Sequence, residues 1–187
     1  AMYANTSGSS NTGIGLSALN ANTSGGANTG IGSNALDANT TASNNTAVGY
    51  NSLGANTTGV SNTAVGFGAL DANTTGTPTT AVGTNALGAN TTGAGNVAIG
   101  ETALEVCTTS VSNTAVGNNA LGDITTGVGQ NVAVGRYAGM KTTTGTSHGY
   151  VGYYTRSNGT TDSTNACFSE GAGESLTTGV QNTAVGM

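Results

Sequence analysis

The sequence predicts an all-β fold, a β-solenoid in the form of a thin two-stranded β-roll with 17-residue coils. A short motif returns at a constant interval, its residues alternate as in a β-strand, and its glycine and Asn-Thr-Thr positions break helices. A unit of 17 residues is also too short for a helical hairpin repeat, which needs about 33 residues.

The repeat reads N-T-A-V-G-x-x-A-L-x-A-N-T-T-G-x-x, and its cleanest copy runs from Asn62 to Pro78. We number its positions 1 to 17. Position 1 is occupied by Asn11, Asn28, Asn45, Asn62, Thr79, Asn96, Asn113, Asn131, His148, Asn165 and Asn182. Every step is 17 residues except the 18-residue step that ends at Asn131. Both ends of the sequence cut through a repeat, so we expect a fragment of a longer fibre.

Positions 2 to 4 carry Thr or Val, then a small residue, then Val or Ile, which is the alternation of a β-strand with one apolar face. The Ala-Leu pair at positions 8 and 9 supplies a second apolar segment. Coils stacked about 4.8 Å apart would align identical side chains, including a ladder of position-1 Asn. We predict a core ladder of Val48, Val65, Val82, Ile99, Val116, Val134, Leu53, Leu70, Leu87, Leu104 and Leu121.

Composition excludes several function classes. The chain has 3 Lys and Arg against 8 Asp and Glu, for a formal charge of −5. So few cations give no electrostatic footprint for nucleic acid. No apolar run approaches the length of a membrane-spanning helix, so we expect no membrane insertion. The acids are scattered, match no calcium loop and accompany a single histidine, so we predict no cofactor, no metal and no enzyme activity.

The predicted core is thin. Burial of one Val and one Leu per coil, worth about 1.5–3 kcal/mol each, is small against a backbone entropy of about 1–2 kcal/mol for every residue that the coil orders. The Ala residues of positions 3 and 8 would form a flat apolar stripe suited to packing against an identical rod. We therefore expect a parallel homotrimer, a closed arrangement that covers exposed sheet surface.

The repeat resembles known surface proteins. N-V-A-I-G at Asn96–Gly100 and the N-T-A-V-G copies resemble the repeats of trimeric autotransporter adhesin heads. The longer 17-residue unit is similar to arrays in phage and bacterial tail-fibre-like proteins. The resemblance covers Ala4 to Met187 and implies left-handed β-rolls, three around one axis, in a virion tail fibre or on an extracellular bacterial surface. The stretch from His148 to Glu174 departs from both patterns.

We expect one continuous solenoid with regular coils over 1–147, degenerate coils over 148–175 and a return to regular repeat over 176–187. Asn158-Gly159 predicts a small loop excursion. Aromatic and arginine side chains gather around the degenerate coils, and such exposed groups commonly mark a binding surface. The candidate patch is Arg136, Tyr137, Tyr150, Tyr153, Tyr154 and Arg156. Local repacking of the core is the alternative interpretation.

Three single residues have structural interpretations. His148 replaces an Asn of the position-1 ladder. Cys107 and Cys167 lie about four coils apart, roughly 19 Å along the rod, which exceeds the reach of a disulfide. We expect both to be buried free thiols.

These observations predict a structural fibre segment that acts as a rigid trimeric spacer and attaches to a host surface receptor or glycan. The alternative is an ice-binding β-solenoid that presents Thr ladders, as at Thr40, Thr57, Thr74 and Thr91. A trimer without ice activity would favour the fibre, whereas a monomer with thermal hysteresis would favour ice binding.

Overall fold

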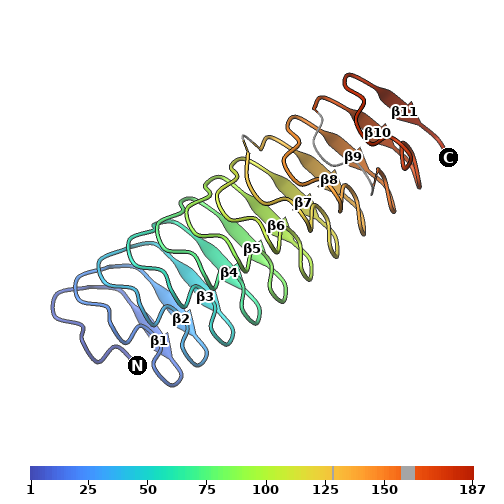
Figure 1. Cartoon of the computed structure of the whole chain (residues 1–187). Helices are drawn as coiled ribbons and strands as arrows, with labels where there is room; N and C mark the ends of the chain where they lie inside the picture. Colours follow the sequence, from blue (N-terminus) through green and yellow to red (C-terminus); the bar gives the residue numbers. More distant parts are fainter. Residues whose placement is uncertain (128, 157–162) are drawn as a thin grey trace.

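A computed structural model describes residues 1–127, 129–156 and 163–187. The chain forms an elongated rod with its termini at opposite ends (Figure 1). Within the described residues, eleven strands of three residues follow one another along the rod in a single parallel sheet, ordered as in the chain. The predicted β-solenoid is therefore confirmed, with one coil per repeat.

The strands occupy repeat positions 2 to 4 of each coil. They are β1 Thr12–Ile14, β2 Thr29–Ile31, β3 Thr46–Val48, β4 Thr63–Val65, β5 Thr80–Val82, β6 Val97–Ile99, β7 Thr114–Val116, β8 Val132–Val134, β9 Gly149–Val151, β10 Ala166–Phe168 and β11 Thr183–Val185. Each pairs with the next at the same repeat position, as Ala64 does with Ala81. The degenerate coils keep this register, since β9 pairs with β8 and β10. The predicted excursion at Asn158-Gly159 lies outside the described residues.

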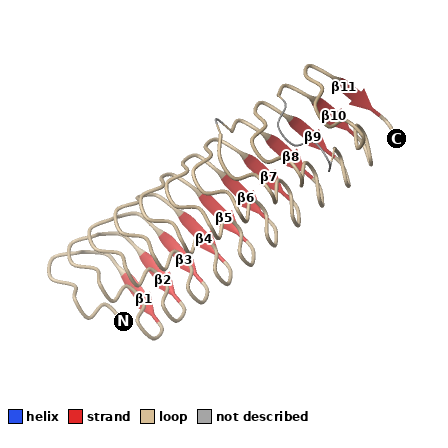
Figure 2. Ribbon diagram, viewed as in Figure 1, coloured by secondary structure: helices blue, strands red, loops and turns tan. Residues whose placement is uncertain are grey.

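The second predicted strand is wrong for the part of the chain that the structure describes. The Ala-Leu side of each coil consists of turns (Figure 2). Positions 7 and 9 adopt left-handed backbone angles, for example φ of 54° at Asn85 and 52° at Leu87. A β-strand requires strongly negative φ at every residue, so this side cannot form one.

Hydrogen bonds between coils nevertheless continue around the turn side. The Leu70 N–H donates to the Ala86 carbonyl at 3.1 Å, and the Thr74 N–H donates to the Thr91 carbonyl at 2.9 Å. Each coil is thus bonded to the next on both sides, which satisfies backbone groups that burial would otherwise leave unpaired.

The core contains the Leu and Ala columns but not the Val column. Leu53, Leu70, Leu87, Leu104 and Leu121 are fully buried, as predicted. The Ala residues at position 3 of strands β3 to β8 are also fully buried, whereas Val48, Val65, Val82 and Val116 are half-exposed. Ile99 and Val134 are 41% and 38% exposed. The predicted direction of the strand is therefore wrong: position 3 faces the interior, and positions 2 and 4 face solvent. The Ala stripe is consequently not a surface for packing against another rod.

The narrow interior explains this orientation. Gly30 occupies position 3 of its coil. A Cβ added to Gly30 would lie 3.1 Å from the Ala35 carbonyl oxygen and 3.3 Å from the Leu19 Cγ. Even a methyl group fits tightly between the strand and the Leu of position 9. A β-branched side chain at position 3 would overfill this space, so the alternation places the larger residues outside.

Two degenerate coils enlarge position 3 and compensate at position 9. Tyr150 replaces Ala, and the preceding coil has Gly139 where Leu is usual; a Cβ on Gly139 would lie 2.4 Å from the Tyr150 ring. Cys167 replaces Ala, and its coil has Gly173, where an added Cβ would lie 2.7 Å from the Cys167 Sγ. Tyr150 and Gly139 together nearly conserve the volume of the usual Ala and Leu, whereas beside Cys167 the Leu176 side chain also packs near Gly173, 3.3 Å from the added Cβ.

Two ladders of buried amides hold the coils in register. At position 1, the Asn45 Oδ1 accepts from the Asn62 backbone N–H at 2.9 Å, and the Asn62 Nδ2 donates to the Gly76 carbonyl at 2.9 Å. At position 12, the Asn56 Nδ2 donates to the Asn39 Oδ1 at 3.1 Å. The position-1 Asn ladder is therefore present, and the position-12 ladder is an addition that the sequence analysis did not foresee.

His148 continues the position-1 ladder, as predicted. Its backbone N–H donates to the Asn131 Oδ1 at 3.0 Å, and its Nδ1 accepts from the Asn165 N–H at 3.2 Å. An imidazole nitrogen thus takes the place of the amide oxygen, which requires the Nδ1 to be unprotonated.

Cys107 interrupts the position-12 ladder. Its side chain cannot supply the amide donor of an Asn, and the Asn90 Oδ1 has no hydrogen-bond partner among the described residues. Both cysteines are buried, and the two do not form a disulfide with each other, as predicted. Burial raises the pKa of the Cys107 thiol to about 11, so the thiol stays protonated near neutral pH.

We expect Cys107 to resist thiol reagents in the folded rod, because the thiolate is the reactive form and the sulfur is buried. In a Cys167→Ala background, reaction with a disulfide reagent at pH 8 should be at least roughly 100-fold slower than in urea. Equal rates in the two conditions would show that the position-12 side of the coil opens readily.

Candidate functional site

The predicted binding patch separates into a buried pair and an exposed cluster. Tyr150 and Arg156 are fully buried. The Arg156 Nη1 donates to the Tyr150 hydroxyl at 3.0 Å, and its Nε donates to the Leu176 carbonyl at 3.2 Å. The inclusion of these two residues in a surface patch is wrong, because they occupy the core-facing positions 3 and 9. For this pair, local repacking of the core is the correct interpretation.

The other four residues lie together at the surface, and we call them the tyrosine cluster: Arg136, Tyr137, Tyr153 and Tyr154. The Tyr137 and Tyr154 ring centroids are 4.7 Å apart with an interplanar angle of 36°. Tyr153 meets Tyr154 edge-on, with centroids 4.6 Å apart. The Arg136 guanidinium carbon lies 4.5 Å from the centre of the Tyr137 ring. Arg136 and Tyr153 are exposed and the Tyr137 and Tyr154 rings are half-buried, so three rings and one cation form one continuous surface over two coils.

Hydrogen bonds fix the arginine of the cluster. The Arg136 Nη2 donates to the Tyr137 hydroxyl at 2.9 Å, and its Nε donates to the Asn118 Oδ1 at 3.3 Å. The Asn118 Nδ2 in turn donates to the Glu101 carboxylate at 3.3 Å. Glu101, Asn118 and Arg136 all occupy position 6, so the bonds run along the rod from coil to coil.

Position 6 forms an exposed ridge that the sequence analysis missed. We call it the position-6 ridge; its residues are Leu16, Ser33, Tyr50, Phe67, Thr84, Glu101, Asn118, Arg136, Tyr153 and Glu170. Tyr50 and Phe67 are stacked on it, with centroids 5.4 Å apart and an interplanar angle of 11°. Its signal in the sequence is the variety of residues at one position within an otherwise constant repeat.

The outer face of the sheet is a second exposed surface, which we call the sheet face. It consists of the Thr or Val column at position 2 and the Val or Ile column at position 4. Ile14, Val132 and Val185 are 58%, 45% and 76% exposed. The face runs the length of the stack, about 48 Å at 4.8 Å per coil, and contains no charged residue in strands β1 to β11.

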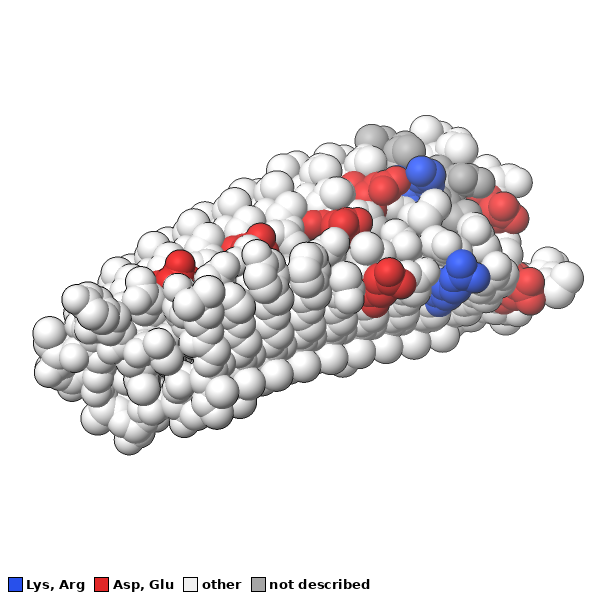
Figure 3. Space-filling view, turned by 90° about the horizontal axis from the view of Figure 1, so that it is seen from below, with Lys and Arg blue, Asp and Glu red and all other residues white. Residues whose placement is uncertain are grey.

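Charged side chains are few and lie in lines along the rod (Figure 3). Lys141 forms an ion pair with Asp123 at 3.2 Å, with both side chains about half exposed. Such a surface pair contributes little to stability. Among the described residues, no three His, Cys, Asp or Glu side chains are close enough to hold a metal ion. The described residues also contain no helix long and apolar enough to cross a bilayer.

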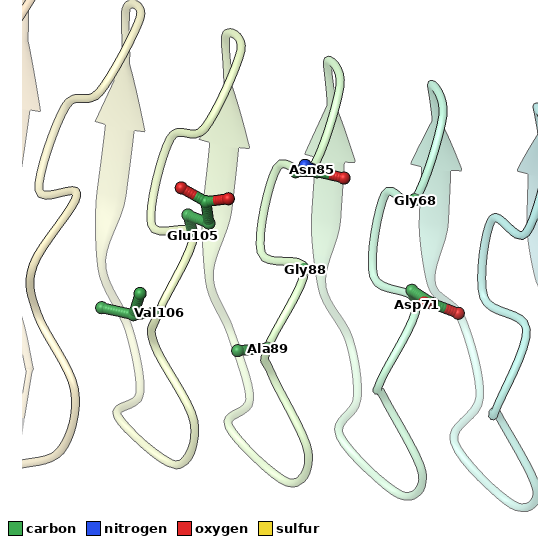
Figure 4. Close-up of a pocket in the computed structure, with 7 residues that line it drawn as sticks. All are labelled: Gly68, Asp71, Asn85, Gly88, Ala89, Glu105 and Val106. Carbon is green, nitrogen blue, oxygen red and sulfur yellow. The ribbon is translucent and has the colours of Figure 1, made fainter.

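A notch of about 340 Å³ opens on the turn side between Asp71 and Glu105. Gly88 lies between these acids at the same repeat position and leaves the space empty, as Figure 4 shows. Burial raises the pKa of Asp71, although a hydrogen bond from Asn51 opposes the shift. Two carboxylates two coils apart do not identify a ligand, so this notch does not define the candidate site.

Comparison with protein-family models, with curated proteins and with solved structures finds no match for this chain. A function is therefore proposed from the geometry of two surfaces, the tyrosine cluster and the sheet face.

Proposed function

We propose that this chain is a rigid segment of a trimeric surface fibre, comparable to the shafts of phage tail fibres and bacterial surface adhesins. The observation that carries the proposal is the sheet face. A continuous parallel sheet exposes one Val or Ile on almost every coil, without a charge, over the whole length of the rod.

An exposed apolar face of this length favours association with a partner. Monomeric proteins rarely expose contiguous apolar patches larger than a few hundred Å². A second and third copy, related by an axis parallel to the rod, would bring equivalent coils to the same level and pack Val against Val. Closed rotational symmetry is also the usual solution for homo-oligomers. The assembly would bury positions 2 and 4 and leave the turn side in solvent.

Absolute mass in solution tests this proposal. Light scattering after size exclusion should give three times the 17.9 kDa of the chain. Val65→Lys places a charge on the sheet face and should reduce the mass to that of a monomer, because a buried unpaired charge is strongly unfavourable. Val60→Lys is the matched control, since Val60 is exposed outside the strands. A monomeric wild type would contradict the proposal.

Ice binding is a second candidate, and the orientation of the strand threonines favours it. Thr29, Thr46, Thr63 and Thr80 lie in one half-exposed column on successive coils. The hydroxyls of the Asn-Thr-Thr column, which the sequence predicts for this role, are used within the rod, since the Thr57 hydroxyl donates to the Thr74 carbonyl at 3.1 Å. The flat sheet face is thus a more suitable ice-binding surface than the Asn-Thr-Thr turn.

Thermal hysteresis separates the two candidates. Ice binding predicts a hysteretic monomer that loses the activity when Thr63 is replaced by Leu, with the mass unchanged. The fibre predicts no hysteresis and a trimeric mass. A trimer without thermal hysteresis would exclude the sheet face as an ice-binding surface, because the neighbouring copies would cover that face.

A further inference from the structure

We propose that the tyrosine cluster, together with Asn118, binds a neutral oligosaccharide that lies along the position-6 ridge. The inference goes beyond the assembly of the rod and does not depend on it. Every group in the site belongs to one chain, and the contacts that fix the site are made within that chain.

Tyr153, which occupies position 6, is not required by the fold, whereas Tyr137 and Tyr154 occupy position 7 and are half-buried. Position 6 has the same place in every coil, yet it holds Ser33, Thr84 and Glu101 elsewhere. Tyr153 is 43% exposed at this position, so its ring adds nothing to the core that Ser or Thr lacks. What distinguishes Tyr153 from the exposed Tyr50 and Phe67 of the same ridge is its contact with a second ring that also packs on the Tyr137 ring beside Arg136, and such a group of rings and a cation is typical of a ligand-binding surface.

The cluster is also preorganised. Tyr154 is held between the other two rings, and Arg136 is fixed by two hydrogen bonds. Binding would therefore cost little side-chain entropy, which is the main obstacle to affinity at an exposed surface. Aromatic rings with polar tips provide contact area and hydrogen bonds from the same side chain.

The chemistry matches a pyranose chain. The C–H face of a sugar packs on an aromatic face, while its hydroxyls bond to groups at the rim of the ring. A guanidinium has five N–H donors, and two of those on Arg136 are used in the bonds described above. The tyrosine hydroxyls and the Asn118 amide supply further polar groups on neighbouring coils, about 4.8 Å apart.

Charge favours a neutral saccharide over other ligands. The Glu101 carboxylate bonds to Asn118, and Glu170 occupies the next place on the ridge after Tyr153. These acids offset the single cation of the cluster, and the whole chain has a formal charge of −5. An anionic polysaccharide or a nucleic acid would therefore be repelled.

Calorimetry with defined oligosaccharides tests the proposal. The probes are cellohexaose, maltohexaose and mannohexaose, with hexagalacturonate as the charged comparison. Because the chain has no Trp, tyrosine emission provides an independent readout. At least one neutral probe should bind, and Tyr153→Ala and Arg136→Gln should each weaken binding by at least about tenfold. Circular dichroism and light scattering on each variant verify fold and mass.

Phe67→Ala is the matched control, since it removes an exposed aromatic side chain from the same ridge outside the cluster. It should change the affinity by less than about twofold. The proposal is overturned if no neutral probe binds at 10 mM, roughly the weakest affinity worth assigning to a site, or if hexagalacturonate binds most tightly. It is equally overturned if Phe67→Ala weakens binding as much as Tyr153→Ala. A monomeric mass would contradict the trimer and leave this result unaffected.

Discussion

Gly66→Ala should destabilise the rod by about 3 kcal/mol or more, through strain at a backbone conformation reserved for glycine. The φ of Gly66 is +138°, and an added Cβ would lie 2.4 Å from the Gly83 carbonyl oxygen in the next coil. This atom belongs to the backbone and cannot rotate away. For a chain of this length, the expected fall in melting temperature is about 6–12 °C.

Gly149→Ala is the matched control. An added Cβ there would meet no atom within 4 Å, and its φ is outside the left-handed region. The melting temperature should stay the same or rise slightly, because Ala restricts the unfolded chain. Thermal melting by circular dichroism measures both variants. Similar behaviour of the two would show that the position-5 glycines of successive coils are not closely stacked.

Gly139→Leu and Tyr150→Ala should each destabilise strongly, and together they should compensate. The first forces a side chain against the Tyr150 ring, since even its Cβ would lie 2.4 Å from that ring. The second removes a buried aromatic group, at about 3–5 kcal/mol, and the hydroxyl bonded to Arg156. The double variant restores the Leu and Ala of the regular repeat, so we expect a favourable coupling of at least about 2 kcal/mol.

Denaturant unfolding of the four species of this cycle gives the coupling energy. Tyr150→Phe isolates the hydroxyl and should cost less than Tyr150→Ala, because the ring remains in place. Gly139→Leu combined with Leu53→Ala serves as the distant pair, and its effects should add within about 0.5 kcal/mol. Additive effects in the Gly139 and Tyr150 pair would contradict the compensation of volume between these coils.

The period of the repeat determined most of the architecture. Eleven motif starts at a near-constant spacing predict the strands and their pairing register, because only stacked coils bring identical positions together. The place of His148 in the position-1 ladder follows for the same reason, because its place in the period determines which residues stack on it. Which residues stack on one another depends on the period alone and not on the direction in which their side chains point.

The direction of the strand could not be deduced from alternation alone. A Thr-Ala-Val strand has one face with Ala and one with Thr and Val, and hydrophobicity favours burying Val. The structure buries Ala64 and leaves Val65 half-exposed, because the coil is too narrow for a β-branched residue opposite the Leu of position 9. Interior volume, a property of the closed coil, thus overrode the hydrophobic preference.

The division of the aromatic patch was likewise a matter of tertiary structure. Sequence proximity grouped Tyr150 and Arg156 with their neighbours, but positions 3 and 9 point inward and position 6 points outward. The sequence by itself determined the repeat, the coil and the stacking register, since these follow from periodicity. Only the closed coil decided which side chains reach solvent, because that depends on the space left between the strand and the turn that faces it.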